Sequence, residues 1–289
     1  MAIVVTAETR LVVQGITGRE GSFHAIRNRG HGTQVVAGVT PGKGGQDVEG
    51  VPVFDTVADA VAETGANTTM VFVPARFATD AIYEAVDAGI ETVICITEHV
   101  PVHEMLRAYT YFRPQGVTMI GPNCPGVLSP GKANVGIIPA EIFSEGVVGL
   151  VSRSGTLTYQ IGHELTQLGL GNSTIVGIGG DPVVGSSFID VLAKFQDDPQ
   201  TELIVMVGEI GGDEEEKAAA FIGDHVTKPV LSYIAGFSAP PGKTMGHAGA
   251  IISGSSGTAQ AKKDALEACG VEVGTTPTEV AGLVAARLK

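Results

Sequence analysis

The sequence contains few of the features that mark disulfide-rich, membrane or secreted proteins. Its three cysteines, Cys95, Cys124 and Cys269, give no disulfide framework, so we expect a reducing compartment, the cytoplasm. No apolar run reaches the roughly 18–20 residues that a membrane-spanning helix needs. The N-terminus lacks a basic segment followed by a long apolar stretch, and we therefore expect neither a signal peptide nor association with a membrane.

Basic residues are also scarce. The chain has 18 lysines and arginines against 31 aspartates and glutamates, a formal net charge of −13. An acidic surface is a poor general binder of nucleic acid, so we expect no nucleic-acid partner. An anionic ligand would have to be attracted by local devices such as helix N-termini. Hydrophobic residues make up 44% of the chain, which supplies one or two sizeable cores and excludes a mainly disordered protein.

The 289 residues alternate between short apolar runs and amphipathic segments, a pattern that predicts an α/β fold with parallel sheets. In the first half the expected strands are 11–14, 34–39, 69–73, 92–96 and 117–120, and the expected helices are 21–29, 56–64, 77–88 and 101–113. In the second half the expected strands are 147–152, 174–178, 203–207 and 229–234, and the expected helices are 155–168, 186–196, 213–224, 258–269 and 277–288.

The stretch 121–145 interrupts this alternation. It is rich in proline and glycine, so we expect an ordered connection without a regular element. The chain length favours two domains, and we place the boundary between them within 121–146.

Glycines gather where predicted strands end and helices begin, which is where open parallel sheets bind ligands. The first such loop, Gly15–Gly21, has the spacing G-x-x-G-x-x-G, so either an anionic cofactor or a bare tight turn explains it. After the second strand, the segment 40–45 carries Lys43 where an NAD site usually presents an acidic residue. This lysine favours a phosphate-rich nucleotide such as coenzyme A over NAD, although a solvated loop lysine stays open.

Two strand ends in the second half carry polar groups that could take part in chemistry. Ser154, followed by Gly155, opens a predicted helix and can either cap it or contribute to a phosphate site. Glu209 stands just after a predicted strand, in the segment Gly208-Glu209-Ile210-Gly211-Gly212.

Among seven histidines, His247 has unusual surroundings, because small residues flank it in a loop that extends over 240–257. No metal-ligand spacing lies nearby, so we expect no metal site. A neutral imidazole can accept a phosphoryl group if a carboxylate holds its other nitrogen, and Glu209 is our candidate for that carboxylate. A structural loop histidine is the alternative.

Eight motifs together make the chain resemble the alpha subunits of succinyl-CoA synthetase, also called succinate–CoA ligase. They are QGITGREG (14–21), TPGKGG (40–45), ITE (96–98), MIGPNCPGV (119–127), VSRSGTLTYQ (151–160), VGIGGDPV (176–183), GEIGG (208–212) and MGHAGAI (245–251). The resemblance extends over nearly the whole length. One departure is Thr244, since similar proteins often carry arginine there.

The resemblance implies a Rossmann-like CoA-binding domain in residues 1–125 and a flavodoxin-like ligase domain in residues 126–289. It places coenzyme A contacts at Thr17, Gly18, Arg19, Glu20, Lys43, Ile96, Thr97 and Glu98. It makes His247 the transiently phosphorylated residue and Glu209 the carboxylate that orients it. It also places phosphate at Ser154 and Gly155, and substrate and partner near Tyr159.

The implied activity is the reversible conversion of succinyl-CoA, phosphate and a nucleoside diphosphate into succinate, CoA and a nucleoside triphosphate, a step of the tricarboxylic acid cycle. Succinyl phosphate and phosphohistidine would be the intermediates, and ADP or GDP would bind with Mg²⁺ on a beta subunit. Three alternatives stay open: a related ligase for malate, a sulfinate analogue or acetate; a non-catalytic CoA-binding module; and an NAD-dependent oxidoreductase.

Overall fold

The computed structural model describes residues 2–240, 242–252 and 257–288. It divides into two compact units. The N-terminal unit consists of Val4–Ile138 and Val183–Gly185, and the C-terminal unit of Met1–Ile3, Pro139–Pro182 and Ser186–Lys289. The units therefore divide at Ile138 and Pro139. The assignment of separate functions to 1–125 and 126–289 remains a prediction.

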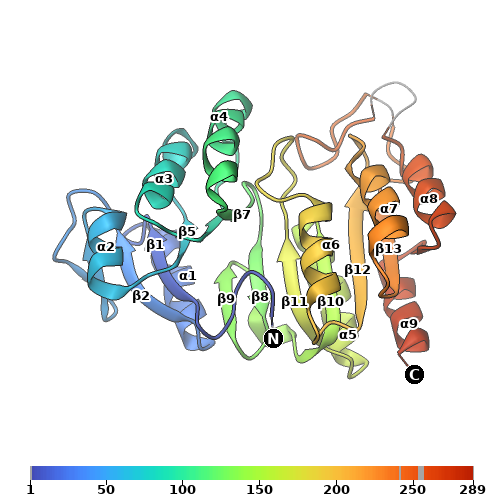
Figure 1. Cartoon of the computed structure of the whole chain (residues 1–289), viewed down its shortest axis with the longest axis horizontal. Helices are drawn as coiled ribbons and strands as arrows, with labels where there is room; N and C mark the ends of the chain where they lie inside the picture. The colour runs from blue at the N-terminus through green and yellow to red at the C-terminus, as the bar shows by residue number, and fades with distance from the viewer. Residues whose placement is uncertain (1, 241, 253–256, 289) are drawn as a thin grey trace. The chain divides into compact units, whose positions relative to one another are not determined.

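The N-terminal unit is built on one twisted sheet, shown with its helices in Figure 1. Its strands are β1 (Arg10–Gln14), β2 (Gln34–Val39), β3 (Asp47–Val48), β4 (Val51–Phe54), β5 (Thr68–Val71), β6 (Thr92–Cys95) and β7 (Thr118–Ile120). Its helices are α1 (Arg19–Gly30), α2 (Val57–Thr64), α3 (Ala75–Asp87), α4 (Val102–Phe112) and the 3₁₀ turn η1 (Arg113–Gln115).

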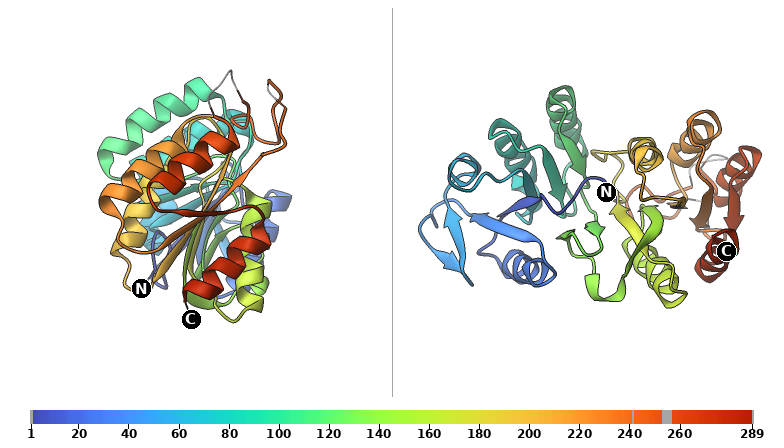
Figure 2. Two further views of the ribbon diagram at one scale, coloured as in Figure 1. Left: turned by 90° about the vertical axis from the view of Figure 1, so that its right-hand side faces the viewer. Right: turned by 60° about the horizontal axis from the view of Figure 1, so that its bottom comes forward.

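The strand order in this sheet is β3-β4-β2-β1-β5-β6-β7, with every pairing parallel except that of β3 with β4. Counting only the parallel strands in chain order gives 3-2-1-4-5-6, the order of the Rossmann fold. Helix α1 covers one face, and α2, α3 and α4 cover the other (Figure 2, right). The order reverses between β1 and β5, so a ligand is expected above the ends of these strands.

The C-terminal unit has a parallel sheet with the order β14-β13-β12-β10-β11. Its strands are β10 (Glu145–Ser152), β11 (Asn172–Gly177), β12 (Leu203–Glu209), β13 (Val230–Ala235) and β14 (Glu272–Gly274). Its helices are η2 (Ala140–Ile142), α5 (Gly155–Gln167), α6 (Phe188–Asp197), α7 (Glu214–His225), α8 (Ala259–Ala268) and α9 (Pro277–Arg287).

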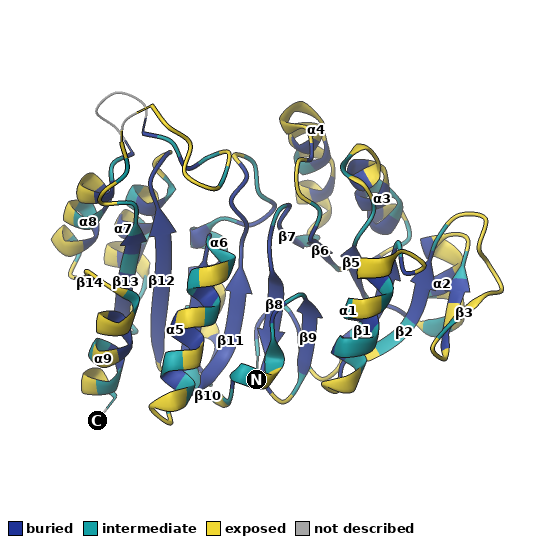
Figure 3. Ribbon diagram, turned by 180° about the vertical axis from the view of Figure 1, so that it is seen from behind, coloured by how far each residue is buried: buried dark blue, intermediate teal, exposed yellow. Residues whose placement is uncertain are grey.

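In chain order these strands give 2-1-3-4-5, the flavodoxin-like arrangement, whose switch point lies between β10 and β12. Helices α6, α7 and α8 cover one face and α5 and α9 the other (Figure 2, left). Every residue of β11 and β12 is buried, as Figure 3 shows by colour. Burial on both faces explains why β12 reads as an apolar run in the sequence, whereas β11 begins with the buried polar residues Asn172, Ser173 and Thr174. The expected Rossmann-like and flavodoxin-like α/β folds are therefore confirmed.

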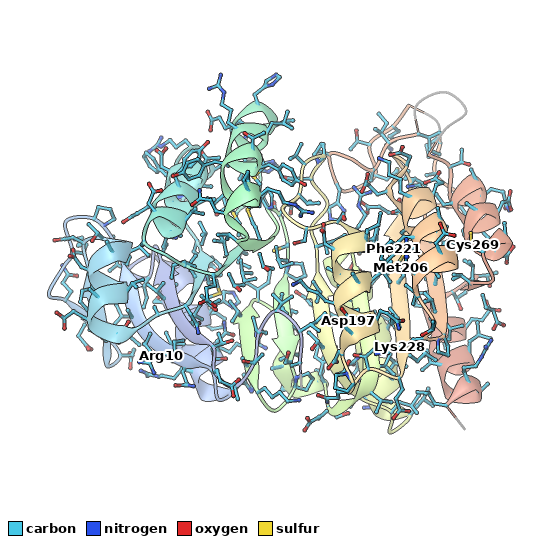
Figure 4. All side chains as sticks on the ribbon, viewed as in Figure 1. Arg10, Asp197, Met206, Phe221, Lys228 and Cys269 are labelled. Carbon is cyan, nitrogen blue, oxygen red and sulfur yellow. The ribbon has the colours of Figure 1, made fainter. Side chains whose placement is uncertain are left out.

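Side-chain contacts stabilise both ends of helix α6. Ser187 and Asp190 form a capping box at the start of α6. At the other end of that helix, Nζ of Lys228 donates to the backbone oxygen of Phe195 (2.7 Å), where the helix dipole favours a cation. Figure 4 labels Lys228 together with Asp197, the last residue of α6.

The expectation of no regular element in 121–145 is wrong. Strands β8 (Gly126–Ser129) and β9 (Ala133–Gly136) form an antiparallel hairpin there, and the hairpin belongs to the N-terminal unit. Side chains distant in sequence hold the hairpin: Nδ2 of Asn28 donates to Gly136 O (3.0 Å), and Oγ1 of Thr33 donates to Asn134 O (2.9 Å). Tertiary contacts of this kind leave no local sequence signal, and the strands β3, β4 and β14 are likewise unexpected.

Within the described residues, no helix is both long enough and apolar enough to cross a membrane.

Candidate active site

A cavity of about 760 Å³ opens at the switch point of the N-terminal unit. Its walls come from the segments that follow β1, β2 and β5, together with the first turns of α3. Thr17, Gly18, Arg19 and Glu20, which the resemblance makes CoA contacts, line this cavity. The cavity therefore lies where the strand order alone places a ligand.

The glycine loop exposes the start of α1 to this cavity. The N-cap residue Gly18 has no side chain to accept a hydrogen bond, so the first amide groups of α1 have no side-chain cap. A Cβ added at Gly21 would lie 2.3 Å from Gly15 O, so only glycine lets helix and loop pack this closely. Uncapped amides, the helix dipole and Arg19 suit an anionic ligand at this point.

The other predicted CoA-contact residues do not line this cavity. Lys43 lies exposed in the turn after Thr40, and Oγ1 of Thr17 donates to Oγ1 of Thr40 (3.1 Å), which joins that turn to the glycine loop. Ile96 is buried, and Oγ1 of Thr97 donates to the backbone oxygen of Val73 (2.8 Å), a residue of the cavity wall. The remaining residue, Glu98, is exposed beside His99.

In the C-terminal unit the structure joins His247 to Glu209. Glu209 is the last residue of β12, and its Oε2 lies 2.8 Å and its Oε1 3.1 Å from Nδ1 of His247. An ionised carboxylate only accepts hydrogen bonds, so Nδ1 carries the hydrogen and donates it. Among the described residues these contacts engage Nδ1, which leaves Nε2 as the ring nitrogen for chemistry.

The imidazole of His247 packs against Gly180. A Cβ added at Gly180 would lie 2.1 Å from Cγ of His247, so the ring packs directly on the backbone of the loop that follows β11. The ring thus rests on the loop after β11 and bonds to the end of β12. Strand β10 lies between β11 and β12 in the sheet. Arg153 and Ser154, which follow β10, therefore lie between the loop that contacts the ring and the end of β12.

Contacts with charged neighbours set the protonation of His247. Its pKa is raised above the ordinary value of 6.5, first by the hydrogen bond to Glu209 and also by the charges of Glu209 and Asp181. Partial burial and the positive charge of Arg153 oppose that rise.

Arg153 connects Glu209 to a buried ion-pair chain. Its Nε lies 3.4 Å from Oε1 of Glu209, and its Nη1 lies 3.7 Å from Oε1 of Glu215. The other carboxylate oxygen of Glu215 contacts Nζ of Lys262. Both Glu215 and Lys262 have fully buried side chains.

Ser154 is the N-cap of α5, as one of its two interpretations predicts. Its Oγ accepts from Leu157 N (3.4 Å), and the helix begins at Gly155. Tyr159 lies one turn further along α5 and is half-buried. The start of α5 therefore presents backbone amides at the carboxyl end of β10, beside the strand that ends in Glu209.

Comparison with known proteins identifies a CoA-binding domain and a CoA-ligase domain in this chain. The signature of the CoA binding domain matches residues 6–99, and that of the CoA-ligase domain matches residues 151–271. Subunit alpha 2 of the ADP-forming succinate–CoA ligase of Archaeoglobus fulgidus is 59% identical over 99% of both chains. The corresponding alpha subunits of Aquifex aeolicus and Staphylococcus epidermidis are 59% and 54% identical over 100% and 97% of this chain, and over 95% and 93% of theirs.

The chain belongs to the family of succinate–CoA ligase alpha subunits. A solved structure of a larger protein shows the same fold. ATP citrate lyase of Methanosaeta concilii, in complex with (3S)-citryl-CoA, has a TM-score of 0.90 at 24% identity. The matching region includes 99% of this chain but only 51% of the lyase, so the chain spans about half the length of that protein.

Sequence reasoning missed the residues behind Glu209 in this succinate–CoA ligase alpha-subunit fold. Glu215 lies in the run Glu214–Glu216, which looks like a solvated helix face, yet it shares the buried stripe of α7 with Ala218, Ala219 and Ile222. Helical spacing could have indicated that burial. Nothing in the sequence distinguishes the buried Lys262 from the neighbouring Lys263, and residues 241 and 253–256 of the predicted loop lie outside the described part of the chain.

Substitution of Gly180 tests whether the ring of His247 packs against the loop after β11. In Gly180→Ala, the new methyl group cannot share space with the imidazole, so the ring moves away from Glu209 and the pKa of His247 falls toward 6.5. An NMR titration of the histidines of the full chain measures this change. Gly282→Ala is the matched control, because a Cβ at Gly282 meets open space. An unchanged pKa in Gly180→Ala would show that the ring does not rest on this loop.

Proposed function

We propose that this chain is the alpha subunit of a nucleoside-diphosphate-forming succinate–CoA ligase that carries a phosphoryl group on Nε2 of His247. The hydrogen bond from Nδ1 to Glu209 is the observation that carries the proposal, because it fixes the tautomer in which Nε2 is a nucleophile. The 53–59% identity to ADP-forming succinate–CoA ligases, over nearly their full length, supports succinate as the acid.

The proposed reaction proceeds in three transfers. Phosphate attacks the thioester carbon of succinyl-CoA and expels CoA as its thiol, which leaves succinyl phosphate. Nε2 of His247 then attacks phosphorus, and succinate leaves with the electron pair of the broken bond between phosphorus and oxygen. Finally the phosphoryl group passes from Nε2 to a nucleoside diphosphate, which we place with Mg²⁺ on a beta subunit.

Residues of this chain contribute electrostatics at each of these steps. Glu209 compensates the positive charge that grows on the imidazole as Nε2 forms its bond to phosphorus. The amides at the start of α5, from Gly155 onward, point a positive dipole at the negative phosphoryl oxygens, with Ser154 as the cap. Tyr159 is proposed to lie near succinate and the partner.

We place the nucleotide part of CoA in the cavity of the N-terminal unit. The glycine loop with Thr17, Gly18, Arg19 and Glu20 would hold phosphate groups at the start of α1, with Lys43 reaching from the adjoining turn. The segment Ile96–Glu98 is proposed to lie along the rest of the CoA molecule. The beta subunit is supported by the names of the relatives, which are alpha subunits, and a cytoplasmic location stays a prediction.

Labelling with γ-phosphate-labelled ATP or GTP tests the nucleophile. In the complex with its beta subunit the wild-type chain should become labelled, and His247→Ala should not. His225→Ala, which changes an exposed histidine of α7, serves as the control and should label normally.

Addition of succinate and CoA should discharge the label, whereas malate or acetate should not. Label on His247→Ala would disprove the assignment, and CoA binding without any label would favour a non-catalytic module.

The pH dependence of phosphorylation follows from the raised pKa of His247. Only the neutral imidazole accepts a phosphoryl group, so the rate should rise with pH through a midpoint above 6.5. Glu209→Gln removes the main cause of the raised pKa, and the midpoint should move to lower pH. The rate at the plateau should also fall, by about 10²- to 10⁴-fold, because the tautomer is no longer fixed. Single-turnover labelling across pH 5–9 (roughly the range in which histidine titrates) measures both effects; a midpoint that does not move would contradict the role of Glu209.

A further inference from the structure

A cluster of four charged side chains, all almost fully buried, lies behind His247. Arg153 and Glu209 are each 8% exposed, and Glu215 and Lys262 are 0% exposed. They come from the ends of β10 and β12 and from helices α7 and α8. Buried ion pairs contribute little net stability compared with apolar packing, so this cluster needs a reason other than stability.

Glu215 contacts the backbone of Glu209 directly and its side chain through Arg153. Its Oε1 accepts a hydrogen bond from the backbone N–H of Glu209 (3.0 Å), which fixes the residue that ends β12. The same oxygen pairs with Arg153, whose Nε reaches Oε1 of Glu209. The carboxylate that bonds to His247 is therefore held at two points, directly through its backbone and indirectly through the guanidinium.

Lys262 completes the support from α8. Its Nζ contacts Oε2 of Glu215 and donates to the backbone oxygen of Gly211 (2.7 Å), in the loop just after β12. It also lies 3.8 Å from Oε2 of Glu216. Lys262 thus holds Glu215 in place and ties it to the loop that begins beside Glu209.

The formal charges in the cluster balance, with two carboxylates against two cations. The guanidinium of Arg153 lies beside the carboxylate of Glu209, and an ionised carboxylate accepts the hydrogen that Nδ1 of His247 carries. The charged groups that face the imidazole are Glu209, Arg153 and Asp181. Those around Lys262 are Glu215, Glu216 and Asp213.

We propose that Glu215, with Arg153 and Lys262, is a positioning residue for phosphoryl transfer, holding Glu209 in the orientation that keeps Nδ1 of His247 protonated and Nε2 bare. This inference rests on the proposed function, since it assigns a task to residues that act through Glu209 and touch no substrate. An ordinary structural ion pair would have a different effect: its removal would leave the tautomer of His247 and the rate of its phosphorylation unchanged.

Two variants test the proposal without leaving an isolated buried charge. Arg153→Lys keeps every charge of the cluster, but a single amine cannot bridge two carboxylates as the planar guanidinium does. Glu215→Gln combined with Lys262→Met removes one negative and one positive charge together. Glu214→Gln is the matched control, since Glu214 is the preceding residue of α7 and pairs with Lys217 at the surface.

Two readouts separate positioning from stability. ¹⁵N NMR of the histidines in the full chain reports which ring nitrogen of His247 carries hydrogen. Single-turnover labelling of the complex with the beta subunit gives the rate constant of phosphorylation and the KM for the nucleotide.

Both variants should show a mixture of His247 tautomers. Their rate constants should fall about 10- to 100-fold, by analogy with the loss seen when the partner behind a metal-binding histidine is removed. The KM for the nucleotide should change little, and Glu214→Gln should match the wild type. Wild-type rates and spectra in either folded variant would overturn the proposal while leaving His247 as the carrier. Because Arg153→Lys conserves charge, it carries the test if the double variant does not fold. Loss of labelling only in His247→Ala, with all cluster variants normal, would therefore reject this inference and keep the proposed function.

Discussion

The hydrogen bond between Nδ1 of His247 and Glu209 is the contact on which the rest of the site depends. It joins a glycine-rich loop to the end of a fully buried strand, β12, and so places a titratable ring on a rigid element. A histidine held at one nitrogen has one tautomer and one free reactive position. The same contact raises the pKa of the imidazole, which sets the pH range in which the ring is a nucleophile.

Both units place their candidate sites by the same rule of parallel-sheet topology. In the N-terminal unit the order reverses between β1 and β5, and the cavity lies there; in the C-terminal unit it reverses between β10 and β12, and Glu209 ends one of these strands. Each site offers the start of a helix, α1 or α5, to an anion. In a chain with a net charge of −13, these local dipoles are the feature that would attract the anionic substrates of the proposed reaction.

Most of the fold could be predicted from the sequence, because buried parallel strands read as apolar runs and the connecting helices as amphipathic segments. The pairing of His247 with Glu209 was also predictable, since a phosphoryl-accepting imidazole needs a carboxylate and Glu209 stands at a strand end. The β8–β9 hairpin was not, because Asn28 and Thr33 hold it from distant positions. The helical spacing of Glu215 with Ala218, Ala219 and Ile222 could have indicated its burial, whereas the burial of Lys262 depends on how α8 packs.

The nitrogen that carries the phosphoryl group tests the central claim most directly. The complex with the beta subunit, prepared with ¹⁵N-labelled histidine and phosphorylated by its nucleoside triphosphate, can be examined by NMR for coupling between phosphorus and each ring nitrogen of His247. The contact between Nδ1 and Glu209 predicts coupling to Nε2 alone. Phosphorus bound to Nδ1, or to another residue, would contradict the account.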